Sequence, residues 1–262
     1  MHDAAEHAEA SQLLSGHWDR GTKLATLPAA LRPTTRRDGY AIQALLEARS
    51  TSPLFGWKIA ATSLNGQKHI NVGGPLAGRI LAERVAADGS AVSLTGNLMR
   101  VAEAEFAFRF ARDLPPAPRP YAVAEVLDAV ATLHPAIELP DSRFSDFTAA
   151  GEANLIADNA CAHDFVLGAA TTADWRAVDL ASHPVAISLN GHRHVGNGAA
   201  VLGDPRIALT WLVNELPEIG TAIKAGQVVT TGTCSLPLPL APGDRFDADF
   251  GALGRVSVRL TD

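Results

Sequence analysis

A stretch of alternating residues within 98–110, clearest over 101–110, constrains the fold more than any other part of the sequence. Its even positions from 102 to 110 are all alanine or phenylalanine, and its odd positions include Glu103 and Glu105. Successive side chains of a β-strand point to opposite faces, so period two predicts a strand with one buried apolar face and both glutamates on the other. The chain must therefore build a sheet that accommodates two neighbouring carboxylates.

The N-terminal part of the chain has a different, helical pattern. An alanine-rich segment over 4–14 predicts a short helix. The segment 38–50 has apolar residues at the spacing of one helix face, with Asp38 as its N-cap. Between them, 24–33 contains two prolines and is expected to be a connector.

From residue 53 onwards, short apolar runs alternate with glycine, proline, asparagine and aspartate, which is typical of many short strands. We therefore predict an α+β protein with two parts. A helical N-terminal region covers 1–52, and a β-rich catalytic domain covers 53–262 as a single globular unit.

Local signals predict several elements within the β-rich part. Asn190-Gly191 between two apolar runs, 185–189 and 192–195, predicts a hairpin with a type I′ turn. Asp204-Pro205 predicts the start of a helix that continues to about residue 216. We also expect an amphipathic helix and six further strand or turn segments: a helix over 122–133, strands over 55–60, 136–139, 228–232, 245–250 and 255–260, and a turn at 241–244.

Charge and composition exclude some kinds of partner. The net charge is −6 without any block of like charges, which argues against nucleic acid or an anionic membrane as the main partner. No apolar run approaches the ~18 residues that span a bilayer, and the N-terminus lacks the pattern of a secretory signal. Cys161 and Cys234 lie far apart and are expected to be buried, reduced thiols. We therefore expect a cytoplasmic protein.

Three glutamates are candidates for a metal site. Glu103 and Glu105 could form either a solvated strand face or a pair of ligands for one ion. An all-oxygen set selects Mg²⁺, Mn²⁺ or Ca²⁺ rather than zinc. Glu138 lies between Ile137 and Leu139, so its burial is expected, and a buried glutamate needs a partner. If the two segments meet, the three carboxylates form a cluster that is stable only around a cation.

Lys58 is the candidate for proton transfer. A lone lysine in an apolar strand usually extends its amine to water. The alternative is a desolvated lysine near a metal, whose lowered pKa suits acid/base chemistry. Other candidates are weaker. His192 and His194 share a hairpin face without further ligands at matching spacing, and Cys234 lies in a turn more typical of ligand binding than of a nucleophile.

Several segments together resemble the fumarylacetoacetate hydrolase superfamily, on its 2-keto-4-pentenoate hydratase / 4-oxalocrotonate decarboxylase branch. Each segment is weak alone, but they occur in the family's order over roughly residues 38–262. They are Gly56-Trp-Lys-Ile-Ala-Ala-Thr-Ser63, Ala102-Glu-Ala-Glu-Phe-Ala107, Arg112-Asp-Leu114, Pro135-Ala-Ile-Glu138, Asp141-Ser-Arg143, Ile156-Ala-Asp-Asn159, Ala199-Ala-Val-Leu-Gly-Asp-Pro205, Lys224-Ala-Gly226, Thr230-Thr-Gly232 and Pro242-Gly-Asp244.

The resemblance implies a large mixed β-sheet, or β-roll, of the fumarylacetoacetase C-terminal type. It also implies a divalent metal, usually Mg²⁺ or Mn²⁺, a small 2-oxo acid as substrate and a homo-oligomer. Lys58 matches the family's acid/base lysine. Thr233, beside Gly232, lies where the family binds a substrate carboxylate. By motif position the metal ligands are Glu103, Glu105 and Glu138.

One position departs from the hydratase pattern. Hydratases of this branch often carry an acidic residue after the proline that matches Pro75, whereas decarboxylases usually carry an aliphatic residue, and this chain has Leu76. Leu76 leaves the second acid/base of a hydratase in doubt and favours the decarboxylase. We expect hydration of a 2-hydroxydienoic acid as the reaction, with 4-oxalocrotonate decarboxylation as the alternative that Leu76 strengthens. An acylpyruvate hydrolase would need a Glu-His pair that we do not find in the N-terminal region. A non-catalytic binding relative is the remaining alternative.

Overall fold

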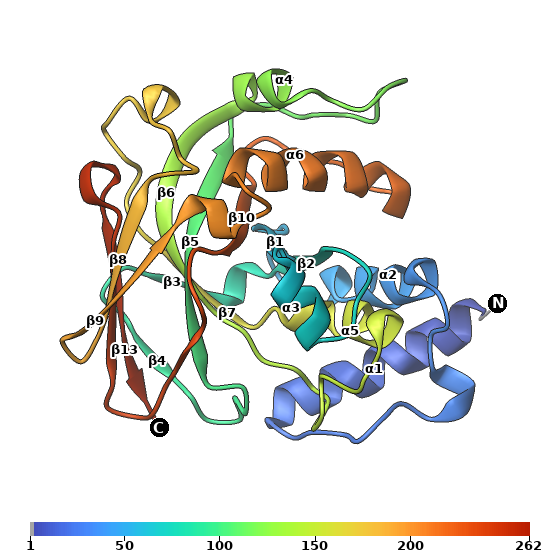
Figure 1. Ribbon diagram of the computed structural model, residues 1–262. Coiled ribbons are helices and arrows are strands. Elements are labelled where there is room, and N and C mark those ends of the chain that lie inside the picture. The colour runs from blue at the N-terminus through green and yellow to red at the C-terminus, as the bar shows by residue number, and fades with distance from the viewer. Residues whose placement is uncertain (1–2) are drawn as a thin grey trace.

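The computed structural model describes residues 3–262, and its largest element is a strongly curled, mixed sheet (Figure 1). Seven of its strands follow the order β2-β1-β10-β5-β6-β7-β3, and β11 pairs with β5. The strands are β1 (Gly56–Ala60), β2 (Leu76–Ile80), β3 (Val85–Ala87), β5 (Val101–Phe110), β6 (Val130–Leu139), β7 (Asp164–Leu167), β10 (Val228–Thr233) and β11 (Leu238–Pro239). The long antiparallel pair β5–β6 forms its centre.

A smaller five-stranded sheet packs against one face of β5 and β6. Its order is β4-β13-β12-β8-β9, with β4 (Ala91–Ser93), β8 (Pro184–Leu189), β9 (His192–Asn197), β12 (Arg245–Asp249) and β13 (Arg255–Thr261). The rings of Phe106 and Phe250 meet edge to face at 5.0 Å. The even positions of β5 are all buried in this core, as the alternation predicted. The glutamates lie on the opposite face of β5.

Within residues 3–262, six α-helices complete the fold, with α1, α2 and α5 together near the N-terminus and α6 against β10 (Figure 1). They are α1 (Ala4–Arg20), α2 (Arg36–Ala44), α3 (Leu64–His69), α4 (Val123–Asp128), α5 (Glu152–Ala157) and α6 (Pro205–Glu215). Short 3₁₀ turns cover Ala29–Leu31, Glu47–Arg49, Ala82–Arg84, Asn159–Cys161, Trp175–Ala177, Gly198–Ala200, Leu216–Ile219 and Gly251–Leu253. None of the helices within residues 3–262 is long and apolar enough to cross a membrane.

The N-terminal helices form at the expected places but with different ends. Helix α1 begins at a capping box between Asp3 and Glu6 and continues past residue 14 to Arg20. The prediction of Asp38 as an N-cap was wrong. Thr35 caps α2 by accepting the amide of Asp38 at 3.1 Å, which places Asp38 in the first turn, where its charge suits the helix dipole. Helix α2 ends at Ala44, before a 3₁₀ turn.

The largest error of the sequence-based prediction concerns 122–133. We expected a helix there and a short strand over 136–139, but α4 ends at Asp128 and β6 already begins at Val130. Strand β6 pairs with β5 from Glu138 opposite Glu103 to Val130 opposite Phe110. This long-range pairing overrides the local helical spacing, because a strand's preference depends on what it packs against.

Short-range signals predicted the turns correctly. Asn190 and Gly191 both have positive φ, 51° and 85°, as a type I′ turn between β8 and β9 requires. Helix α6 begins at Pro205 with Asp204 as its N-cap.

Both cysteines in the described part of the chain are free and buried.

Candidate metal and catalytic site

Three glutamates converge on the inner face of the larger sheet. Alternation along β5 places Glu103 and Glu105 on one face, and the antiparallel register sets Glu103 opposite Glu138 on β6. One carboxylate oxygen from each residue lies within 4.8 Å of the others. Glu105 and Glu138 are 0% and 2% exposed, and Glu103 is partly buried. The interpretation as a solvated strand face was therefore wrong.

The carboxylates keep oxygens free for a ligand. Glu105 Oε2 accepts the Thr230 hydroxyl and, at 2.8 Å, the amide of Gly232. Glu105 Oε1 and Glu138 Oε2, in contrast, are buried without a hydrogen-bond partner among residues 3–262. Buried anionic oxygens without a donor are costly, and a cation removes that cost. The all-oxygen donor set fits a hard divalent cation.

Electrostatics point the same way. Burial, reinforced by the charge of Glu138, raises the pKa of Glu103 to about 7. Burial also raises the pKa of Glu105 well above its usual range, with Glu138 and then Glu103 adding to the effect. Three desolvated carboxylates repel one another, so the cluster holds protons unless another positive charge replaces them.

Lys58 lies at the edge of this cluster, in the middle of β1. Its side chain is buried, and Nζ forms an ion pair with Glu138 Oε1 at 2.8 Å and donates to Ala160 O at 3.1 Å. Two expectations are corrected here. The amine does not extend to water, and its pKa is raised rather than lowered. Burial lowers the pKa of Lys58, but the charges of Glu138 and Glu103 outweigh that effect and favour the ammonium form.

A glycine makes room for the lysine stem. Gly78 on β2 is the register partner of Lys58. A Cβ atom at position 78 would lie 3.0 Å from Lys58 Cγ and Cδ and 2.5 Å from Asn159 O. Any larger residue here would displace the lysine or the backbone behind it.

Leu76 begins β2 and is fully buried. Helix α2 holds the backbone on both sides of it. Arg36 Nη2 donates to Pro75 O at 3.2 Å, and the Ala77 amide donates to Tyr40 Oη at 3.0 Å. Leu76 alternates with Gly78 along β2 and so shares its face with Lys58. This position of the site therefore carries an aliphatic side chain and no acid.

Gly232 and Thr233 lie at a bulge where β10 runs beside β5. The pairing shifts between Thr230 and Thr233, which brings Thr233 opposite Glu105. Gly232 has φ 106°, and a Cβ there would meet Thr62 Oγ1 at 2.1 Å, so only glycine fits. The Thr233 hydroxyl donates to Ser235 O at 3.0 Å. The bulge also directs the Gly232 amide toward Glu105, to which it donates a hydrogen bond.

Comparison with known proteins identifies the family, although no protein-family profile matches the chain. The 2-hydroxyhexa-2,4-dienoate hydratase of Comamonas testosteroni is 36% identical over 236 residues, which cover 87% of each chain. The 2-keto-4-pentenoate hydratase of Paraburkholderia xenovorans is 30% identical over 255 residues, which cover 96% of this chain and 93% of that one. The chain belongs to the 2-keto-4-pentenoate hydratase / 4-oxalocrotonate decarboxylase branch of the fumarylacetoacetate hydrolase superfamily.

Solved structures agree with this family and its fold. The 4-oxalocrotonate decarboxylase from Pseudomonas putida G7, complexed with magnesium and adipate, superposes with a TM-score of 0.91, at 26% identity and over 99% of both chains. The 5-carboxymethyl-2-hydroxymuconate delta-isomerase from Mycobacterium smegmatis, at 14% identity and a TM-score of 0.57, covers 80% of this chain and 78% of its own and shares the fold alone. The chain is a lyase of the hydratase / decarboxylase branch.

Two features of the site lie in or beside segments that resemble the family, but the sequence assigned them no role. One is Thr230, which anchors Glu105. The other is the turn Asn159–Cys161, whose three residues have φ of 56°, 50° and 61°. The Asn159 side chain holds this left-handed turn by bonding the amide and carbonyl of Arg79 at 2.7 and 2.9 Å. Left-handed non-glycine residues are costly and gather at functional sites, and here they present Ala160 O to Lys58.

The weaker sequence candidates lie outside the site or are inert. His192 and His194 are exposed on β9, as expected. Burial raises the pKa of Cys234 well above its usual range and that of Cys161 to about 12, so neither thiol is activated as a nucleophile.

Proposed function

We propose that this protein is a divalent-metal-dependent hydro-lyase that adds water to 2-hydroxypenta-2,4-dienoate or a related 2-oxo or 2-hydroxydienoic acid, in the degradation of aromatic compounds. The observation that carries the proposal is the buried convergence of Glu103, Glu105 and Glu138 with Lys58 at 2.8 Å from Glu138. Hydratases as relatives at 30–36% identity support the reaction class.

The metal would be held by the three glutamates. Carboxylate ligands favour Mg²⁺ or Mn²⁺, and the decarboxylase of similar structure was solved with magnesium. When bound, the cation supplies a Lewis acid for the negative charge that develops on the 2-oxo group of the substrate.

Lys58 would carry the proton. The raised pKa keeps its amine as ammonium, so Lys58 can donate a proton to the substrate carbon. The hydroxyl proton that the dienol loses as it becomes the ketone would return to the Lys58 amine. Water then adds to the far end of the conjugated ketone. Because Lys58 is buried and bonded to Ala160 O, its Nζ is held in one direction and bulk water is kept away from it.

Thr233 and Gly232 would lie at the substrate carboxylate. This placement is supported by the bulge beside Glu105, which brings backbone and hydroxyl groups close to the metal ligands. To bind a carboxylate, the Thr233 hydroxyl would release Ser235 O and turn toward the site.

The test is ultraviolet spectroscopy of 2-hydroxypenta-2,4-dienoate with purified protein and Mg²⁺ or Mn²⁺. We expect the dienol absorbance to disappear when metal is present. With chelated protein, or with the Glu105→Gln variant, the absorbance should stay unchanged. Glu125→Gln is the matched control, because Glu125 is a surface acid paired with Arg119. Full activity with excess chelator would disprove the metal-dependent mechanism.

A second candidate function is 4-oxalocrotonate decarboxylation, and Leu76 is the observation that favours it. An aliphatic side chain in this position leaves no second acid to assist water addition. A distal carboxylate could instead leave as CO₂ while the electrons of the broken bond flow into the same conjugated, metal-held system. Incubation with 4-oxalocrotonate and detection of CO₂ decides between the reactions. Rapid CO₂ release without hydration of the pentadienoate would replace the hydratase proposal.

We also propose that the protein works as a cytoplasmic homo-oligomer, with a helical region over 1–52 and a catalytic domain over 53–262 in one globular unit. The family resemblance, which implies a homo-oligomer, supports the assembly. Gln43 supports a single unit, since its side chain donates to Ala77 O and Ile156 O. Light scattering during gel filtration tests the assembly, and a monomer would contradict it.

A further inference from the structure

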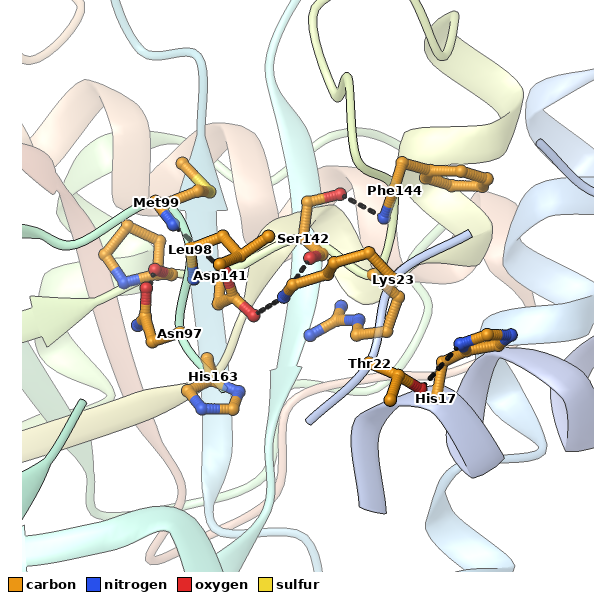
Figure 2. Close-up of polar contacts among 12 residues, drawn as sticks. His17, Thr22, Lys23, Asn97, Leu98, Met99, Asp141, Ser142, Phe144 and His163 are labelled. Atoms are coloured by element: carbon orange, nitrogen blue, oxygen red, sulfur yellow. Dashed lines mark hydrogen bonds and ion pairs between the residues drawn. The ribbon is translucent and has the colours of Figure 1, made fainter. Parts of the chain in front are cut away.

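Asp141 lies three residues beyond Glu138, where the chain leaves β6. Its side chain is buried. Figure 2 shows its carboxylate between two segments that are distant in sequence. Oδ1 accepts the amides of Leu98 and Met99 at 2.9 and 3.2 Å. One oxygen therefore holds the segment that leads directly into β5.

A second contact joins the same two segments. Asn97 Nδ2 donates to Pro140 O at 3.1 Å, one residue before Asp141. The entrance of β5 and the exit of β6 are thus bonded together at the end of the sheet where Glu103 faces Glu138. The sequence expectation of a strand from residue 98 fails here, because these amides bond to Asp141 rather than to a neighbouring strand.

The N-terminal region supplies the balancing charge. Lys23 Nζ forms an ion pair with Asp141 Oδ2 and donates to Ser142 O at 2.6 Å (Figure 2). Both side chains are almost fully buried. A buried carboxylate without such a partner is strongly destabilising, so Lys23 allows Asp141 to occupy this position.

We propose that Asp141 is a positioning residue that fixes the entrance of β5 beside the exit of β6, and so holds the glutamates in the arrangement that a small cation requires. This inference rests on the proposed metal site. Mg²⁺ needs near-ideal octahedral ligands at about 2.0–2.1 Å, whereas Ca²⁺ accepts flexible coordination at about 2.3–2.6 Å. A looser β5–β6 junction therefore weakens Mg²⁺ binding more than Ca²⁺ binding.

The test compares two double variants by calorimetric titration with MgCl₂ and with CaCl₂. Lys23→Met with Asp141→Asn keeps the oxygen that accepts both amides, and Lys23→Met with Asp141→Ala removes it. Neither leaves a buried charge unpaired. We expect the alanine variant to bind Mg²⁺ about 10-fold more weakly than the asparagine variant, in the range seen when groups that orient metal ligands are lost. The Ca²⁺ affinities should differ by less than about 3-fold.

Glu47→Gln is the control for lost stability. It weakens another contact between the N-terminal region and the sheet, the pair of Glu47 with Arg79 at 2.6 Å, and touches neither β5 nor β6. Its Mg²⁺ affinity should equal that of the wild type. If the alanine double variant does not fold, Asn97→Ala loosens the same junction and should show the same selective loss of Mg²⁺.

The outcomes separate the positioning role from the metal site itself. Equal Mg²⁺ affinities in the two double variants, or equal losses for both ions, would disprove the role of Asp141 while leaving the metal site standing. Failure of the wild-type protein to bind either ion would disprove the metal site, and the positioning role with it.

Discussion

Lys58 Nζ and Glu138 Oε1 lie 2.8 Å apart although β10 and β5 separate their strands. Three strand spacings in a flat sheet would place the two backbones about 14 Å apart with parallel side chains. The curl of the sheet turns the side chains of β1 and β6 toward each other. This relationship joins the proposed proton carrier to the proposed metal ligands.

Lys58→Met should abolish turnover but retain the metal. Loss of a general acid typically lowers a rate by about 10²- to 10⁴-fold. Removing the ammonium also takes a positive charge away from Glu138, so Mg²⁺ affinity should be equal to or greater than that of the wild type. Ketonisation of the dienol and calorimetric Mg²⁺ binding measure the two effects. A near-normal rate would remove Lys58 from the mechanism.

The stability of the chelated protein should fall as pH rises. Glu103 has a folded-state pKa of about 7 against an ordinary value of 4.5, so between these values the folded protein holds more protons than the unfolded chain. Stability from this group is complete below about pH 4.5 and is lost as pH rises through 7. Melting temperatures in EDTA from pH 5 to 8 should show this fall, and Mg²⁺ should reverse it.

Glu103→Gln provides the control for that pH dependence. Its amide does not titrate, so the fall attributable to position 103 should disappear and Mg²⁺ should stabilise the variant less. A wild-type pH profile in the variant would show that other groups cause the change.

Gly78→Ala should damage both the fold and the catalytic lysine. The new methyl group would lie 2.5 Å from Asn159 O and 3.0 Å from the Lys58 stem. Overpacking of this kind costs about 1–3 kcal/mol of unfolding free energy. Gly73→Ala is the matched control, because a Cβ at position 73 meets nothing within 4 Å. Urea unfolding and turnover of both variants are the measurements, and equal behaviour would contradict the prediction.

Leu76→Asp should shift the reaction toward hydration. The new carboxylate would share the face of Lys58 and could position or deprotonate the attacking water. Product analysis on 2-hydroxypenta-2,4-dienoate and 4-oxalocrotonate should show a higher ratio of hydrated to decarboxylated product. Leu76→Asn introduces a side chain of the same size as aspartate but without the acid, so it should keep the wild-type ratio. An unchanged ratio in both variants would remove position 76 as the determinant of the reaction.

Local rules in the sequence accounted for the turns and for half of the candidate site. Asn190-Gly191 and Asp204-Pro205 act within a few residues, so their turn and helix start could be predicted directly. The common face of Glu103 and Glu105 follows from alternation inside one strand. The family motifs added Glu138 and Lys58 as partners without indicating how the chain brings them together.

The tertiary structure alone decided what depends on distant pairing. Strand β6 replaces the end of the predicted helix because eight of its residues pair with β5, and this long-range stabilisation is not contained in any short stretch of sequence. The pKa of Lys58 rises because the curled sheet brings Glu138 to it, against the effect of burial. Asp141 holds the entrance of β5 because Lys23, 118 residues away, neutralises it. Each result comes from charges and hydrogen bonds that only the folded chain brings within reach.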